Sequence, residues 1–124
     1  MFEVRYDKER DCLVGSFTGT LDLKTITQFA KAIAAAAQKH DCKRFLNDMR
    51  KAKVDFSTVE LYRMPGVLDA SGLDRSWRRA IIASKQLKDY RFFETVAQNQ
   101  GYSVRVFTDP DEALTWLKAD TPDP

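Results

Sequence analysis

A chain of 124 residues has the usual size of a single domain, and its hydrophobic fraction of 44% is typical of a folded protein rather than a disordered one. Its 20 basic and 18 acidic side chains leave a net charge of only +2, which argues against a protein that binds nucleic acid by neutralising phosphates, so we predict no nucleic-acid partner. No run of 18 apolar residues occurs, so no membrane span is predicted, and two cysteines outside any CxxC pattern favour a reduced, cytoplasmic location.

The N-terminal part of the chain changes from strand rhythm to helical rhythm. Apolar and polar residues alternate over 2–6 and again over 12–18, on either side of a charged turn, which predicts an antiparallel hairpin broken at Gly19. Asp22 can cap a helix that ends near His40, and a short strand is predicted over 44–49. The first strand would lie at a sheet edge, where a second copy could pair with it, so a homodimer is one expected assembly.

The next helix is predicted to begin at Ser57. The Ser57 hydroxyl can act as an N-cap, and Glu60 three residues later completes a capping box. Pro65 and Gly66 should kink or interrupt this helix, because proline lacks the backbone N–H that a helix interior needs. The polar stretch 69–76 is predicted as a loop.

The C-terminal half repeats strand and helix. Consecutive apolar residues within 79–84 predict a central strand covered on both faces, and apolar spacing over 87–97 predicts a helix that stops before Gly101. A last strand is predicted over 102–107, and Asp109 with Pro110 begins the final helix.

The predicted order of elements is ββαβαβαβα. Alternating strands and helices favour one α/β domain over 1–118, built on a single mixed, mainly parallel five-stranded sheet. The residues from Ala119 to Pro124 are predicted to form a flexible C-terminal tail.

This order is similar to that of STAS-like domains, a bacterial family of anti-sigma-factor-antagonist-like proteins with many uncharacterised members. The similarity is strongest in the C-terminal half: the strand 79–84, the helix with Phe92 and Phe93, Gly101, and the segment 104–117. The resemblance implies a non-enzymatic regulatory module that binds a protein partner, such as a kinase or another regulator, and needs no cofactor.

Anti-sigma antagonists carry a regulatory serine in an Asp-Ser-Ser-Gly motif at the start of the helix after the third strand. The corresponding residues here are Asp55, Phe56, Ser57 and Thr58, so the aspartate and the second serine match, while Phe56 and Thr58 replace the first serine and the glycine. The resemblance implies Ser57 as a phospho-acceptor or partner-binding residue, with Asp55 and Thr58 beside it. The residues alone favour a plainer role for Ser57 as a helix cap. The stretch 69–73 matches the motif letters better but follows a helix, and we interpret it as a turn.

A ligand site is the alternative hypothesis. Asp48 would end the third strand at the carboxyl edge of a parallel sheet, where ligands commonly bind in open α/β folds. Asn47 and Asp48, with Tyr62 and Met64 from the 57–68 helix, are therefore candidate ligand-binding residues. An apolar pocket between that helix and the sheet would make the protein a carrier of a small apolar ligand or lipid.

Catalytic and metal chemistry have little support in the sequence. An enzyme would need Asp48, Asp55 and Ser57 to converge in a cleft; they are expected near the same sheet edge, which we interpret as a solvated rim of loops. The only histidine, His40, has no second ligand at metal-binding spacing, so no metal site is predicted. Two basic segments are interpreted as solvated faces, although an arginine beside Trp77 could stack on a base or an acidic partner; they contain Lys43, Arg44, Arg50, Lys51 and Lys53, and then Arg75, Arg78 and Arg79.

Overall fold

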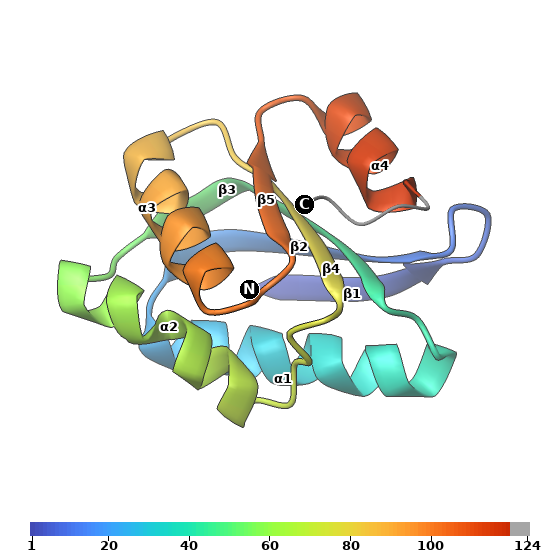
Figure 1. Ribbon diagram of the computed structural model, residues 1–124, viewed down its shortest axis with the longest axis horizontal. Helices are drawn as coiled ribbons and strands as arrows, with labels where there is room; N and C mark the ends of the chain where they lie inside the picture. The colour runs from blue at the N-terminus through green and yellow to red at the C-terminus, as the bar shows by residue number, and fades with distance from the viewer. Residues whose placement is uncertain (120–124) are drawn as a thin grey trace.

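The computed structural model describes residues 1–119, and its elements follow the predicted order (Figure 1). The strands are β1 (Phe2–Asp7), β2 (Cys12–Leu21), β3 (Arg44–Val54), β4 (Arg78–Ile82) and β5 (Val104–Phe107). The helices are α1 (Leu23–His40), α2 (Thr58–Ala70), α3 (Leu87–Asn99) and α4 (Pro110–Lys118). Of the predicted tail only Ala119, the C-cap of α4, belongs to the described chain; residues 120–124 lie outside it.

The five strands form one sheet in the order β1-β2-β3-β4-β5. β1 is antiparallel to β2, and every other neighbouring pair is parallel, which confirms the predicted mixed, mainly parallel sheet. β1 and β5 lie at the two edges. Three helices, α1, α2 and α3, pack on one face, where the larger core contains side chains from all of them. α4 alone covers the other face, over a smaller core that includes Leu46, Ala80 and Trp116.

β2 and β3 are longer than the sequence pattern indicates. β2 continues through Gly19 to Leu21, and β3 continues past Met49 to Val54, so both predicted ends were wrong. Ser16 pairs with Asp48 and Thr18 with Lys51, which leaves two residues of β3 opposite one residue of β2. This is a β-bulge, and it reverses the alternation of side chains along β3.

The consequence of the bulge is visible in the core. Met49, the first of the two bulged residues, packs in the larger core, and Ala52 and Val54 pack in the same core after the bulge, although their spacing from Met49 breaks a two-residue rhythm. A strict period of two therefore ends the strand too early.

α2 runs without interruption through Pro65, contrary to the predicted break. Leu61, Met64 and Leu68 lie one helical turn apart and are all buried against the core, and the capping box at Ser57 stabilises the first turn. Packing and capping therefore outweigh the hydrogen bond that proline cannot donate. The loop that follows begins at Ser71, not at Asp69.

Candidate functional site

The start of α2 presents the predicted phospho-acceptor. The Ser57 hydroxyl accepts a hydrogen bond from the backbone N–H of Glu60 at 3.1 Å, and the Glu60 carboxylate accepts one from the backbone N–H of Ser57 at 2.9 Å. This confirms the predicted capping box. Asp55, Ser57 and Thr58 are all exposed, so the hydroxyl lies at the surface at a helix N-terminus.

Two apolar side chains continue this exposed surface along α2. Val59 and Tyr62 are 59% and 63% exposed, and they lie on the outer face of the helix together with Arg63. Tyr62 was predicted to line a pocket beneath the helix, but it points outward and does not line it. It belongs to an outward surface beside Ser57, which we call the α2 surface: Ser57, Val59, Tyr62 and Arg63.

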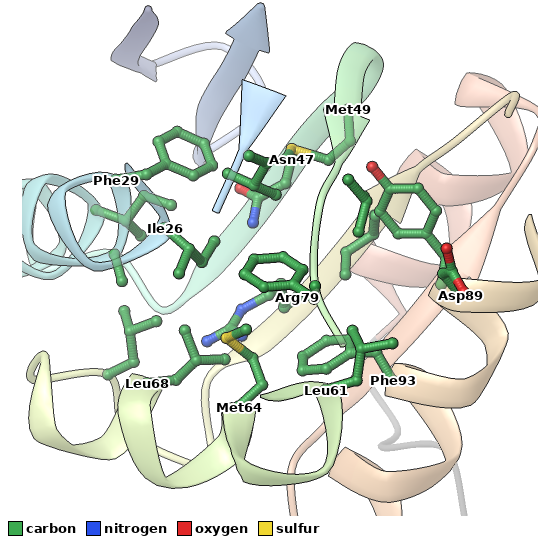
Figure 2. Close-up of a pocket in the computed structure, with 18 residues that line it drawn as sticks. Ile26, Phe29, Asn47, Met49, Leu61, Met64, Leu68, Arg79, Asp89 and Phe93 are labelled. Carbon is green, nitrogen blue, oxygen red and sulfur yellow. The ribbon is translucent and has the colours of Figure 1, made fainter. Parts of the chain in front are cut away.

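An apolar cavity lies on the other side of α2, between the helices and the sheet (Figure 2). The space open to the centre of a water molecule is about 70 Å³. Met64 and Asn47, two of the predicted ligand residues, line this cavity. Apolar side chains from β2 to β4 and from α1, α2 and α3 make most of the wall, among them Leu21, Ile26, Phe29, Met49, Leu61, Leu68 and Phe93.

Three polar side chains in the cavity wall have a buried atom without a hydrogen-bond partner among residues 1–119. They are the Asn47 amide oxygen, the Arg79 Nε and the Tyr90 hydroxyl. Asn47 comes from β3, Arg79 from β4 and Tyr90 from α3. Gly15 on β2 makes room for this arrangement, because a Cβ there would lie 2.9 Å from the Phe29 ring and 3.3 Å from the Asn47 oxygen.

Arg79 is the residue that the sequence analysis placed wrongly. We expected it on a solvated basic face, but it is only 4% exposed. β4 is covered on both faces, and alternation along it directs Arg79 and Ile81 toward the cavity. Burial lowers the pKa of the Arg79 guanidinium to about 10. Its guanidinium carbon lies 6.0 Å from the Phe45 ring centre and 5.9 Å from that of Tyr102, so two aromatic rings are among its neighbours.

Tyr90 lies within the apolar spacing over 87–97, which predicts only a helix. It is buried, and burial together with the nearby Asp89 carboxylate raises the pKa of its hydroxyl to about 12. The phenol is therefore protonated at neutral pH and can donate a hydrogen bond into the cavity. A tyrosine in a helical stripe gives no sequence signal of such a role.

Asp48 does not end β3, which continues to Val54, but it pairs with Ile82, the last residue of β4. Its side chain lies on the opposite face of the sheet from that of Asn47. Its carboxylate receives two hydrogen bonds from the Arg50 guanidinium, at 2.8 and 2.9 Å. These bonds hold the pKa of the Asp48 carboxyl below its usual value. Asp48 is therefore separated from the cavity by the thickness of the sheet, because successive residues of a strand point to opposite faces.

The polar residues considered for catalysis have separate partners. Asp48 bonds to Arg50 and Ser57 bonds to Glu60, and within residues 1–119 no hydrogen bond joins Asp48, Asp55 and Ser57. No group of three or more potential metal ligands occurs in the same residues. None of the helices in the described chain is long and apolar enough to cross a membrane.

The C-terminal end of α2 is tied to the rest of the domain by a polar cluster. The Tyr102 hydroxyl lies 2.9 Å from the Pro65 carbonyl and also contacts the Asp69 carboxylate. Arg75 donates to the other Asp69 oxygen at 2.7 Å and to the Gln100 carbonyl at 2.6 Å. Hydrogen bonds from Arg75 and then Tyr102 lower the pKa of the Asp69 carboxyl. This cluster fixes one end of the helix that covers the cavity.

Comparison with known proteins identifies the fold. No family model matches the sequence, and no curated protein matches it. A crystal structure of an anti-sigma factor antagonist from Mycobacterium paratuberculosis is similar over 96% of this chain and 96% of that one, with a TM-score of 0.61 and 15% identity. An uncharacterised protein from the DUF3478 family with a SpoIIAA-like fold, from Shewanella loihica PV-4, is similar over 94% of this chain and 93% of its own, with a TM-score of 0.58 and 19% identity.

These likenesses confirm the fold that the STAS resemblance implied. The chain has the architecture of an anti-sigma factor antagonist, described for the second relative as SpoIIAA-like. At 15% and 19% sequence identity, these similarities establish the fold alone.

Proposed function

We propose that this domain is a non-enzymatic regulatory module that binds another protein through the α2 surface. The observation that carries the proposal is the pair of exposed apolar residues, Val59 and Tyr62, directly beside Ser57. Aromatic side chains on an otherwise polar surface are characteristic of protein contacts. The solved relative is named as an anti-sigma factor antagonist, and such a role requires a protein partner.

Phosphorylation of Ser57 would act at this surface. A phosphate adds about −1.5 to −2 charges, and the N-terminus of a helix favours an anion. Thr58 and Asp55 flank the hydroxyl and are exposed with it, so a kinase could reach all three. A partner that binds over Tyr62 would then contact the phosphate on Ser57 at the edge of the interface.

Capture from the host's lysate with the tagged full chain tests the docking surface. We expect one partner to be retained by the wild-type chain and lost by Tyr62→Ser. Phe92→Ser is the matched control, since Phe92 is an exposed aromatic on α3, at 38% exposure, and should keep the partner. The same set of captured proteins with all three chains would contradict a role for the α2 surface.

The switch has its own test. The wild-type chain and Ser57→Ala are incubated with host extract and ATP, and phosphate is located by mass spectrometry. We expect phosphate on Ser57 and weaker capture of the partner by Ser57→Asp. An unmodified Ser57 together with unchanged capture by Ser57→Asp would remove the switch and leave the docking proposal standing.

The cavity supports a second candidate function, the binding of a small apolar ligand. Its wall is mostly apolar, and α2 with Met64 covers it. Native mass spectrometry of protein purified from its host should then show a bound small molecule. Only ligand-free protein, together with no binding of added apolar molecules, would contradict this function.

A further inference from the structure

The cavity contains a buried positive charge that no described group neutralises. Within residues 1–119 the Arg79 guanidinium makes no ion pair and no side-chain hydrogen bond, and it is 4% exposed. Nearly all buried charges in folded proteins are paired, because an isolated charge loses its hydration without compensation. A guanidinium in this state lacks an anion.

The described chain does not supply that anion. Within residues 1–119, Asp89 is the only acidic residue in the cavity wall, and Figure 2 shows it at the opposite side of the cavity from the Arg79 guanidinium. The guanidinium itself points into the cavity, toward the space between Met64 and Leu68 of α2 and Ile26 of α1. An incoming ligand can therefore meet it directly.

The unpartnered groups define the chemistry of that ligand. One guanidinium is balanced by one monovalent anion, whereas a divalent phosphate would leave a negative charge in an apolar cavity. A carboxylate accepts two parallel hydrogen bonds from a guanidinium, because its two oxygens match the spacing of two guanidinium N–H groups. The Tyr90 hydroxyl adds a hydrogen-bond donor to the same wall, whereas the unpartnered Asn47 oxygen is an acceptor and does not serve a carboxylate. All other lining residues except Asp89 are apolar.

The volume limits the size of the apolar part. A cavity needs about 10–15 Å³ of space open to the centre of a probe to hold one water molecule. The 70 Å³ here therefore accommodates only a few water-sized atoms without movement of α2. A chain of about four to six carbons is the size that this estimate suggests.

We propose that the cavity binds a short-chain monocarboxylate, with its carboxylate on Arg79 and its hydrocarbon chain against Met64, Leu68 and Phe29. This inference rests on the second candidate function and adds the headgroup and the size of its ligand. It is independent of partner binding at the α2 surface.

Binding to the full chain is measured by calorimetry and by NMR, with hexanoate and its neutral analogue hexanamide as a matched pair. We expect hexanoate to bind about tenfold more tightly or better, since hydrogen bonds to a charged group are among the strongest in proteins. In a series from acetate to dodecanoate, affinity should be greatest at about four to six carbons. Affinity that rises steadily to dodecanoate would contradict the short chain.

Variants assign the preference to Arg79. Arg79→Met should bind hexanoate and hexanamide about equally. Arg79→Lys should keep part of the preference, because lysine keeps the positive charge but lacks the two parallel N–H groups of a guanidinium. Arg78→Met is the matched control: Arg78 is the preceding residue of β4, lies over the Trp116 ring on the α4 face, and should leave the preference unchanged.

The outcomes separate the two levels of the proposal. Equal affinities of wild-type protein for hexanoate and hexanamide would disprove the carboxylate site and leave an apolar pocket. Failure of both to bind, with no chemical-shift changes at Met64 or Ile26, would disprove the ligand-binding function as well.

Discussion

A guanidinium in a protein normally lies in water or against a carboxylate, and Arg79 does neither. It is buried among aromatic rings and the apolar wall of the cavity. The sequence predicts a solvated face for Arg79 together with Arg75 and Arg78, because adjacent arginines usually lie at a wet surface. On a strand, however, neighbours point to opposite faces, so Arg78 and Arg79 have different surroundings.

A buried, unpaired charge lowers stability, so Arg79→Met should raise it. We expect the free energy of unfolding of ligand-free protein to increase by about 1 kcal/mol or more, since replacing buried charged groups with apolar ones of similar volume is neutral or stabilising. Urea denaturation at neutral pH without added carboxylates measures this. Arg78→Met should gain less stability than Arg79→Met, because it also removes a contact with Trp116 and a hydrogen bond to the Ala119 carbonyl, although two Arg78 nitrogens are buried without a partner among residues 1–119. A loss of stability with Arg79→Met would mean that its charge is already compensated.

Ser57 shows the opposite case, in which the local sequence was sufficient. A capping box depends on residues three apart, and both of its hydrogen bonds are present. We expect Ser57→Ala to lower the free energy of unfolding by about 1 kcal/mol and Ser57→Asp to leave it nearly unchanged, because aspartate caps a helix as well as serine does. Thermal denaturation of the three chains checks this. If Asp destabilises as much as Ala, Ser57 does not act as a cap.

At the level of elements, α2 is held at both ends, by its cap and by the Tyr102 cluster. Tyr102→Phe removes the hydroxyl that contacts Pro65 and Asp69. We expect a loss of about 1 kcal/mol in stability and faster hydrogen exchange of amides in 58–70, with β4 unaffected. Tyr62→Phe is the control, because Tyr62 is on the outer face of the same helix. Equal protection of α2 in both variants would show that the cluster does not anchor the helix.

The two edge strands differ in how they are covered. α3 lies along β5, where the side chains of Arg91 and Glu94 pair with the backbone of Val106, and Gln98 donates to the Val104 carbonyl. These bonds occupy backbone groups that could otherwise join another strand. β1 has no described strand on its outer side. Pairing of β1 with a second copy stays a prediction, and it is the edge at which we expect a homodimer.

For the whole molecule, two buried ionisable groups, Arg79 and Tyr90, make the free energy of unfolding depend on alkaline pH in opposite directions. The pKa of Arg79 is lowered to about 10, so between about pH 10 and the higher ordinary pKa of arginine the unfolded chain binds more protons, and this group raises stability as the pH rises. The pKa of Tyr90 is raised from 10 to about 12, so its contribution is complete below pH 10 and is lost as the pH rises through 12.

Removing Arg79 should therefore change the alkaline profile. We expect the stability advantage of Arg79→Met over wild type to be constant between about pH 7 and 9 and to shrink above about pH 10, because the wild-type guanidinium then loses its proton and its burial cost. Urea denaturation of both chains at each pH measures the difference. A difference that stays constant to pH 12 would show that Arg79 keeps its ordinary pKa when buried.

The amino-acid sequence alone determined the order of elements, the single mixed sheet and the helix caps at Asp22, Ser57 and Asp109. These features depend on residues within a few positions of each other, so their signals are local. The ends of β2 and β3 depend on tertiary structure, because a bulge changes the two-residue alternation of side chains by which a strand is recognised in a sequence. Tertiary structure also decided which polar residues face the cavity. Three of these residues come from elements far apart in the chain: Asn47, Arg79 and Tyr90. They line one cavity only because the helices pack on the sheet, and their spacing along the sequence does not indicate this.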